Sequence, residues 1–490
     1  MDLHRRLHAL MLVVSVVAWV ALCGTGWAQT TQPKDDATAP APEAKAAEAP
    51  AAPAPAPAPA AAAPSDPVEA WIKKAKNPVP WWKWGADFRI REVYQLNPTL
   101  LNTKGPEPDA HWQRYRGRFW STIAPFEDVL EFNFRIAWEG RYYDKPDSRD
   151  NWTPQNVYLD NLNFKVKFDK LVGFPLSFQG GRQDIQLGDR WLVMDGTPLD
   201  GSGTFYFDAV RLVAEIEPIK TKFDLIFLEQ NADAEDWVYP IAYHHQPVVE
   251  QDELGVIAWI TNKSIPKTEV NGYFIYKRGR PYLANGYDAE IYTFGLLVAG
   301  DITPKLRYSV DVAGQFGNKN DANLCALGSL DRLTYSFKDK LDSQLYTEYE
   351  YLSGDDPGTR GTNESFDILW GRYPQFSDLY VYTMVRETRV GDYTNLHRLA
   401  FGYITHPIKK MEASATYHLL FSETNPLGDM PRFSQTGNFR GQLLTAILKY
   451  KFTSFMTGML QGEFLFPGDY YTDDSNDPSV FLQAELMFSF

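Results

Sequence analysis

The chain has 490 residues, of which 44% are hydrophobic and 22% are charged, and its formal net charge is -14. This acidic balance argues against nucleic acid as a partner, because binding to a phosphate backbone requires clustered Lys and Arg. The mean hydropathy of -0.36 is that of a soluble protein, but the 14% of aromatic residues is enough to build girdles at a membrane surface.

Residues 1–28 are predicted to be an export signal. Arg5 and Arg6 precede an apolar run over residues 9–23, and small residues flank position 27. A charged start, a short apolar run and a small-x-small step predict cleavage after Ala28. The run is too short for a membrane helix, and no stop-transfer pattern follows it.

Two cysteines are present, at positions 23 and 325. A lipoprotein anchored through Cys23 is disfavoured, because Leu22 is larger than the small residue usual before such a cysteine. Once the signal is removed only Cys325 remains, so no intramolecular disulfide can form. We interpret Cys325 as a small buried hydrophobe.

Residues 29–78 are predicted to form a disordered periplasmic spacer. Residues 30–66 are dominated by Ala and Pro, a composition that cannot bury a core and that proline keeps extended. A short amphipathic piece, PVEAWIKKAKNP, joins this spacer to the folded part. The spacer is either a plain tether or a contact for a periplasmic partner.

From Trp84 onward, segments of about ten residues alternate apolar and polar side chains. This is the pattern of a strand with one lipid-facing and one water-facing side. The same pattern recurs near residues 114–119, 130–139, 161–168, 306–315 and 344–351. In the first three segments the polar face carries six arginines: Arg89, Arg91, Arg114, Arg116, Arg118 and Arg135.

The connections between these segments alternate in length, as the inner turns and outer loops of an outer-membrane barrel do. The short links expected are 124–128, 169–173, 217–221, 262–267, 300–304, 338–340, 406–410 and a turn near Thr453. The long ones expected are 97–110, 140–156, 184–206, 231–250, 278–287, 317–328, 422–437 and 467–478. The alternation holds only if 353–394 is one long outer excursion, although Tyr380–Arg386 resembles a strand.

The last twelve residues, SVFLQAELMFSF, give the clearest strand. Val480, Leu482, Ala484, Leu486 and Phe488 share one face, and the other face carries Gln483, Glu485 and Ser489. A strand that is apolar outside, wet inside and terminated by an aromatic residue is typical of the closing strand of a membrane barrel. The fold class expected over residues 79–490 is therefore all-β: a transmembrane antiparallel β-barrel of about 18 strands with long outer loops.

Two stretches resemble a known family: GRQDIQLGDRWLVMDGTPLDGSGTFYFDAVRL from Gly181, and SGDDPGTRGTNESFDILWGRYP from Ser353, followed by NLHRLAFGYITHPIKKMEASATYHLL. They resemble the alginate export domain family of outer-membrane porins. The matching positions are Gly181, Arg182, Gln183, Gly188, Asp189, Arg190, Phe207, Asp208, Arg211, Gly354, Asp355, Asp356, Pro357, Phe366 and Asp367.

This resemblance covers about residues 79–490 and leaves out the Ala/Pro spacer. It implies an 18-stranded channel in the cell outer membrane, with arginines along the lumen and with loops folded inward to narrow it. Through such a channel an anionic polysaccharide would leave the periplasm. The expected partners are outer-membrane lipid and this cargo, and we expect a monomer with no cofactor.

The six arginines of the first strands suit carboxylate cargo, because planar guanidinium groups match carboxylate geometry and several weak sites in series permit passage. Lys165 and Lys167 extend the positive wall, and Asp87, Glu131 and Glu139 oppose it. The alternative interpretation is a ladder of basic and acidic side chains that satisfy one another across the wall.

A second group of charges interleaves with the Gly-rich stretch from Gly188 to Gly203. Its members are Arg182, Asp184, Asp189, Arg190, Asp208 and Arg211. A long polar loop of this kind either folds into the pore and sets its aperture or remains exposed without a gating role. The excursion 353–394 is the other candidate constriction.

No catalytic or metal-binding set is predicted. Glu348 and Glu350 fall on one strand face, where they are more typical of arginine partners than of a glycosidase pair. His244 and His245 are adjacent and would point opposite ways. The acidic stretch 473–477 is predicted to be a solvated loop rather than a Ca²⁺ site.

These patterns favour an outer-membrane channel for passive export or diffusion of an alginate-like anionic polysaccharide. A general porin for small nutrients is the alternative. An outer-membrane enzyme or adhesin is a third possibility, but it would need a catalytic set or a binding surface on the outer loops that the sequence does not offer.

Overall fold

The computed structural model describes residues 67–126, 129–148, 150–194, 206–233, 249–371, 374–384, 387, 393–428 and 430–490. The signal peptide and the Ala/Pro-rich part of the spacer lie outside these residues. A helix, α2 (Pro67–Lys76), precedes the first strand. Among the described residues no helix is long and apolar enough to cross a membrane.

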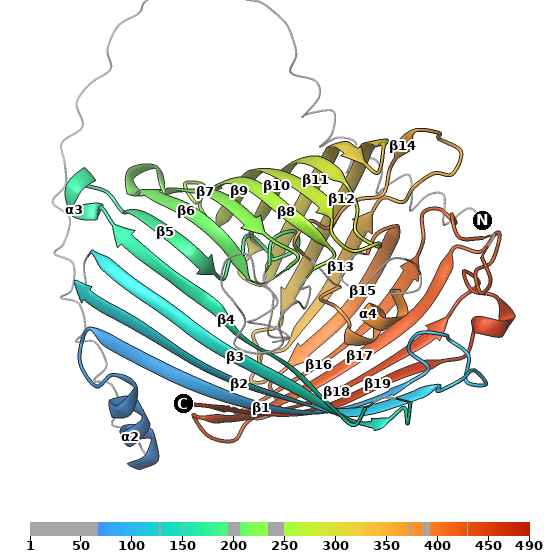
Figure 1. The fold of residues 1–490 in the computed structure, drawn as a ribbon, viewed down its shortest axis with the longest axis horizontal. Helices are drawn as coiled ribbons and strands as arrows, with labels where there is room; N and C mark the ends of the chain where they lie inside the picture. The colour runs from blue at the N-terminus through green and yellow to red at the C-terminus, as the bar shows by residue number, and fades with distance from the viewer. Residues whose placement is uncertain are drawn as a thin grey trace, which may run out of the picture. The chain divides into compact units, whose positions relative to one another are not determined.

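The strands form one closed antiparallel ring (Figure 1). They are β1 (Trp82–Leu96), β2 (Asp109–Phe126), β3 (Leu130–Lys145), β4 (Trp152–Lys167), β5 (Leu176–Gln183), β6 (Phe207–Ile216), β7 (Thr221–Gln230), β8 (Gln251–Asn262), β9 (Thr268–Pro281), β10 (Ala289–Thr303), β11 (Leu306–Lys319), β12 (Ala322–Ser336), β13 (Gln344–Leu352), β14 (Thr362–Asn363), β15 (Leu396–Thr405), β16 (Met411–Phe421), β17 (Phe439–Lys451), β18 (Met456–Pro467) and β19 (Ser479–Ser489). Because β14 is a two-residue strand that pairs in parallel with β12 outside the ring order, 18 strands make the wall. The prediction of an antiparallel barrel of about 18 strands is confirmed.

The C-terminal strand closes the ring, as its sequence pattern predicts. β19 pairs with β1 from Asp87↔Ser489 to Leu96↔Val480. Beyond this ladder, the backbone N–H of Phe490 donates to the carbonyl of Ala86 at 2.7 Å, and the N–H of Ala86 donates to the carbonyl of Phe490 at 3.1 Å. The barrel therefore has no unpaired edge at this seam.

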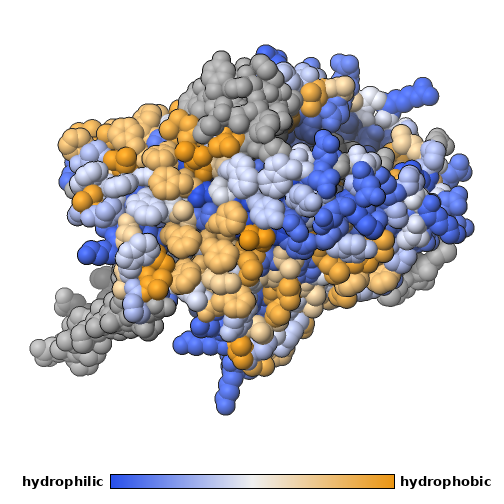
Figure 2. Space-filling view, turned by 60° about the horizontal axis from the view of Figure 1, so that its bottom comes forward, coloured by the Kyte–Doolittle hydropathy of each residue, from blue (hydrophilic) through white to orange (hydrophobic). Residues whose placement is uncertain are grey.

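The wall is apolar on its outer face. In β7, for example, Leu225 is 52% exposed while its neighbours Asp224 and Ile226 are buried at 4% and 0%. Leu and Phe side chains exposed at every second position fit contact with lipid rather than water. Figure 2 shows such apolar side chains gathered in patches over the strands.

Most of the predicted connections are present, but the prediction of a long loop over residues 317–328 is wrong. β11 runs on to Lys319 and β12 begins at Ala322, so only two residues connect them. These residues, Asn320 and Asp321, have φ of 50° and 66°, as both positions of a type I′ hairpin turn require. Since Asn and Asp tolerate this conformation, a sequence that resembles an open loop instead forms a tight turn.

The connection 353–395 is a single excursion between neighbouring strands β13 and β15, as expected. The strand-like stretch within it is the helix α4 (Asp378–Met384). The remaining short elements are α3 (Asp169–Val172), η1 (Glu217–Ile219) and η2 (Asp473–Ser475). The loop expected over 140–156 is shorter than predicted, because β3 extends to Lys145 and β4 begins at Trp152.

Candidate functional site

Five of the predicted arginines form one cluster on the inner face of β1 and β2. These are Arg89 and Arg91 on β1, and Arg114, Arg116 and Arg118 on β2. Four of them are buried, with Arg89 only 1% exposed and Arg116 only 2% exposed. The structure therefore packs these guanidinium groups within the barrel, where the sequence predicted an open lining.

Three carboxylates accompany this arginine cluster. Arg91 donates to Glu485 at 2.8 and 2.9 Å, and Arg118 pairs with Asp87 at 2.5 Å. Arg114 is bonded to Glu139. Within the part of the chain that the structure describes, these contacts bring three carboxylates of the neighbouring strands against the arginine cluster.

The pairing of β1 with β2 places like charges opposite each other within the cluster. Arg89 lies directly opposite Arg116, and Arg91 directly opposite Arg114. Like charges at directly opposed positions of an antiparallel pair repel each other. The Nε and Nη1 atoms of buried Arg116 also have no hydrogen-bond partner among the residues that the structure describes.

Arg135 and Arg211 each have acidic partners. Arg135 binds Asp160 at 2.8 Å and Asp184 at 2.7 and 2.8 Å. Arg211 binds Asp224 at 2.6 Å. At these positions the structure matches the ladder of mutually satisfied charges.

Arg182 and Asp208 occupy a different face from the one predicted. They lie opposite each other in the β5–β6 register and bind through two contacts of 2.8 Å. Along β6, Asp208 alternates onto the side of Val210, whose side chain is 42% exposed on the outside of the barrel. Because the Gly-rich sequence hides this register, they were placed in the lumen, whereas they stabilise each other within the wall.

The segment after β5 folds into the barrel. Trp191, Leu192 and Val193 are buried, and a Cβ atom at Gly188 would lie 2.9 Å from the Trp259 ring and 3.1 Å from a methyl group of Leu297 on the inner wall. Asp189 accepts a hydrogen bond of 2.6 Å from Ser309 on β11. Residues 195–205, the rest of the predicted Gly-rich loop, lie outside the described residues.

This segment meets the long excursion inside the barrel. Val193 and Trp370 form a parallel β-bridge, and the rings of Trp191 and Phe366 stack with centroids 5.4 Å apart. The peptide carbonyl of Arg190 accepts a hydrogen bond from Gln375. The two candidate constrictions are therefore one structure, which we call the inserted segments (184–194 and 353–394).

Two glycines of the wall make room for the inserted segments. A Cβ atom on Gly255 of β8 would lie 2.4 Å from the Trp370 ring, and one on Gly328 of β12 would lie 2.9 Å from the Phe366 ring. Both distances are too short for real contacts. Glycine within a strand commonly marks such a close approach.

A charge network then fixes Asp367 against β9 and β11. The ammonium group of Lys319 donates to Asp367 at 2.9 Å, and that of Lys277 lies 3.5 Å from it. Glu253 completes the network, accepting a bond of 2.9 Å from the indole of Trp370 and lying 3.3 Å from Lys277. Burial raises the pKa of Asp367, but Lys277 and Lys319 lower it more, so its pKa falls below the usual range.

The other end of the excursion is anchored across the barrel. Glu463 on β18 accepts backbone N–H groups of Asp378 and Leu379, each at 3.0 Å, at the start of α4. Tyr393 donates to Glu350 on β13 at 2.9 Å, just before β15 begins. The excursion therefore crosses the interior from the β8–β11 wall to β18 and returns.

A cavity of 920 Å³ lies beside the inserted segments. It reaches the ends of β11 and β12 that lead to short turns, at Arg307 and Thr334. Its charged lining mixes both signs: Arg190, Arg307, Arg332 and Arg398 with Asp189, Glu348 and Glu350. On that side the interior remains open to a hydrated solute.

Several important residues were not recognised as a site from the sequence, among them Glu485, Lys277, Lys319 and Glu463. Their inward orientation follows from strand alternation, but their partners lie on distant segments.

Glu348 and Glu350 both bind Arg398, at 2.5 and 2.9 Å, which confirms them as arginine partners.

Of the other metal candidates of the sequence, only the acidic stretch 473–477 lies among the described residues. Asp477 accepts hydrogen bonds from the backbone N–H and the hydroxyl of Thr103, at 2.8 and 2.6 Å, which gives this acidic stretch a structural role. His244 and His245 lie outside the described residues.

The protein family described as alginate export matches residues 81–480. The chain belongs to the alginate export family. The matched range contains the whole strand ring except the C-terminal part of β19.

Solved structures share the fold. OccAB2 of Acinetobacter baumannii is 10% identical with a TM-score of 0.51, over 83% of this chain and 98% of that one. OccK7 (OpdD) of Pseudomonas aeruginosa is 10% identical with a TM-score of 0.50, over 84% and 99%. The comparison with curated proteins gave no match.

Together, the family and the fold identify an outer-membrane protein of the channel type. The long excursion of this alginate export family member carries Phe366 and Asp367, two of the positions on which the resemblance was recognised. Both act in holding the inserted segments, since Phe366 stacks on Trp191 and Asp367 anchors to two lysines.

Proposed function

We propose that the protein is a passive outer-membrane channel for an anionic, alginate-like polysaccharide. The supporting observation is the arginine cluster on β1 and β2, where Arg89 opposes Arg116 and Arg91 opposes Arg114. A wall that served only stability would favour alternating charges at these positions. A row of adjacent guanidinium groups gives the carboxylates of a passing chain places to bind in turn.

Burial of the cluster adds a condition to this proposal. α4 lies near it, since the ring of Tyr382 is 6.1 Å from that of Trp112 on β2, and Thr383 donates to the carbonyl of Pro98. A polysaccharide can reach the arginines only when the inserted segments shift. The channel we propose is therefore narrow at rest and opens by movement of these segments.

Charge reversal tests the arginine cluster. Changing Arg114, Arg116 and Arg118 to Glu should abolish or reverse the anion selectivity of single channels in planar bilayers, because the local charge inverts. The neutral triple change to Gln should reduce the selectivity without reversing it. Arg278→Glu is the control, because Arg278 faces outward, 3.6 Å from Glu290.

Unchanged selectivity in a folded triple Glu variant would remove the arginine cluster from the transport path.

Block of the ion current by added oligosaccharides distinguishes the proposed channel from a general porin for small nutrients. Oligouronates at low concentration should block the ion current of the unaltered channel, whereas neutral oligosaccharides of equal length should not. Equal block by both would favour the general porin.

A further inference from the structure

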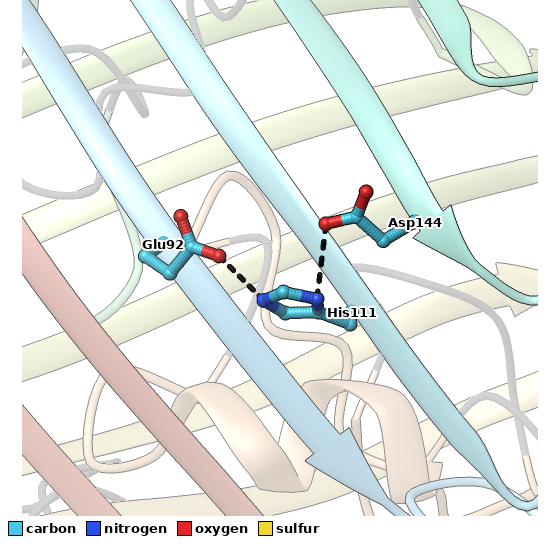
Figure 3. A group of neighbouring side chains, drawn as sticks. All are labelled: Glu92, His111 and Asp144. Carbon is cyan, nitrogen blue, oxygen red and sulfur yellow. Dashed lines mark ion pairs between the residues drawn. The ribbon is translucent and has the colours of Figure 1, made fainter.

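A small polar cluster lies on the outer face of the barrel, away from the lumen. It consists of Glu92 on β1, His111 on β2 and Asp144 on β3 (Figure 3). In β1 the buried inner face holds Arg89 and Arg91, so Glu92 points outward by alternation. All three lie near the ends of their strands next to the loops 97–108 and 146–151.

The imidazole of His111 is placed between two carboxylates. Its Nε2 faces Glu92, and its Nδ1 lies 3.1 Å from Asp144. A neutral imidazole carries one N–H and donates only once, so one of these two contacts joins a lone pair to a carboxylate. Such a contact is repulsive unless a second proton or a cation occupies it.

A β-bulge aims the third side chain. His111 pairs with Lys145 and Trp112 pairs with Tyr143, which leaves Asp144 as the extra residue on β3. Bulges of this kind redirect a side chain at the rim of a barrel. Here the redirected carboxylate turns toward His111, as Figure 3 shows.

The local charge favours a cation. The nearest lysine, Lys145, binds Asp109 at 2.7 Å, and no Lys or Arg ion pair to Glu92 or Asp144 is found among the described residues. The three side chains are between 34% and 43% exposed, so an ion reaches them from solvent. One ligand atom from each lies within 4.8 Å of the others.

We propose that Glu92, His111 and Asp144 bind a divalent transition-metal cation such as Zn²⁺ at the outer rim of the barrel. One ring nitrogen and its facing carboxylate ligate the ion, and the second carboxylate joins as a ligand or accepts the other N–H. The latter is the usual way a carboxylate orients a metal-bound histidine. The nitrogen ligand selects Zn²⁺, Co²⁺ or Ni²⁺ over Mg²⁺ and Ca²⁺.

Zn²⁺ titration of the full chain tests the site, with the protein folded in detergent, free of affinity tags and treated with chelator. Calorimetry should show about one ion bound per chain, and Co²⁺ should give a visible absorption spectrum that Zn²⁺ abolishes. His111→Gln and, separately, Glu92→Gln should weaken binding roughly tenfold or more.

His406→Gln is the matched control. His406 is also on the barrel and partly exposed, but it faces a single carboxylate, Glu412 at 3.7 Å, which Lys449 already neutralises at 3.0 Å. This variant should bind Zn²⁺ as the unaltered protein does. Absence of stoichiometric binding, or equal binding by the His111→Gln variant, would overturn the proposal.

Discussion

Replacing Asp367 by Asn is expected to raise the single-channel conductance several-fold. The change removes the carboxylate charge that both buried lysines, Lys277 and Lys319, contact, while Glu253 stays beside Lys277. Removing one partner of a buried ion pair costs about 3–5 kcal/mol. We expect the excursion to detach from the wall, because this exposes the lysines to water and avoids that cost. The detached excursion leaves a wider path for ions. Planar bilayer recording measures the conductance.

Gly255→Ala should produce the same opening by a different route, because the new methyl group would lie 2.4 Å from the Trp370 ring and displace it. Two controls accompany these variants. Gly272→Ala adds its methyl group where no atom lies within 4 Å, and Asp356→Asn removes an exposed carboxylate of the same excursion. Conductance equal to the controls in both variants would show that the inserted segments do not limit the current.

The contact of Asp367 also has a defined response to pH. Because its pKa is lowered in the folded protein, its stabilising contribution is complete above the ordinary pKa of about 3.9. The contribution is lost only as the pH falls below that value toward the lowered one. Conductance should therefore be unaffected by this group between pH 7 and 5, and an opening that titrates in this range would have to come from another group.

Phe294→Arg is expected to destabilise the barrel strongly. Phe294 lies near the middle of β10 and is 52% exposed on the lipid side. An arginine at the centre of the hydrocarbon layer costs about 2–4 kcal/mol in a membrane barrel. Unfolding by urea in lipid vesicles measures this free energy.

Thr334→Arg is the comparison, because Thr334 lines the 920 Å³ inner cavity. There the guanidinium remains hydrated, so its free energy of unfolding should stay close to that of the unaltered protein. If both variants lost the same stability, the assignment of the two faces would be wrong.

The ring of strands was predictable because its signal is local. Alternation reports which face of each strand is apolar, as in the last twelve residues, and the alternation of short and long connections gives the expected strand number. Strand ends were less predictable. Asn320 and Asp321 occur in a stretch rich in Gly and Asn that resembles a loop, whereas their backbone forms a two-residue turn.

The interior was only partly predictable. The inward position of the arginines of β1 and β2 follows from alternation, but their burial does not. The approach of α4 to the end of β1, where Thr383 donates to Pro98, joins segments almost 300 residues apart and is not visible in the sequence either. Arg182 and Asp208 were expected in the lumen because they border a Gly-rich stretch, although β5 and β6 hold them opposite each other in the wall. The triad of Glu92, His111 and Asp144 is invisible in the sequence, because only strand pairing and a bulge bring it together.

The seam between β1 and β19 bears on how this protein is made. Arg91 and Glu485, which are bonded across it, are 394 positions apart in the chain. Until Ser479–Ser489 have been synthesised, β1 has no neighbour on one side and the growing sheet keeps two open borders. Assembly in the bilayer therefore waits for the last strand, and the secreted polypeptide has to be shielded from aggregation until that strand arrives.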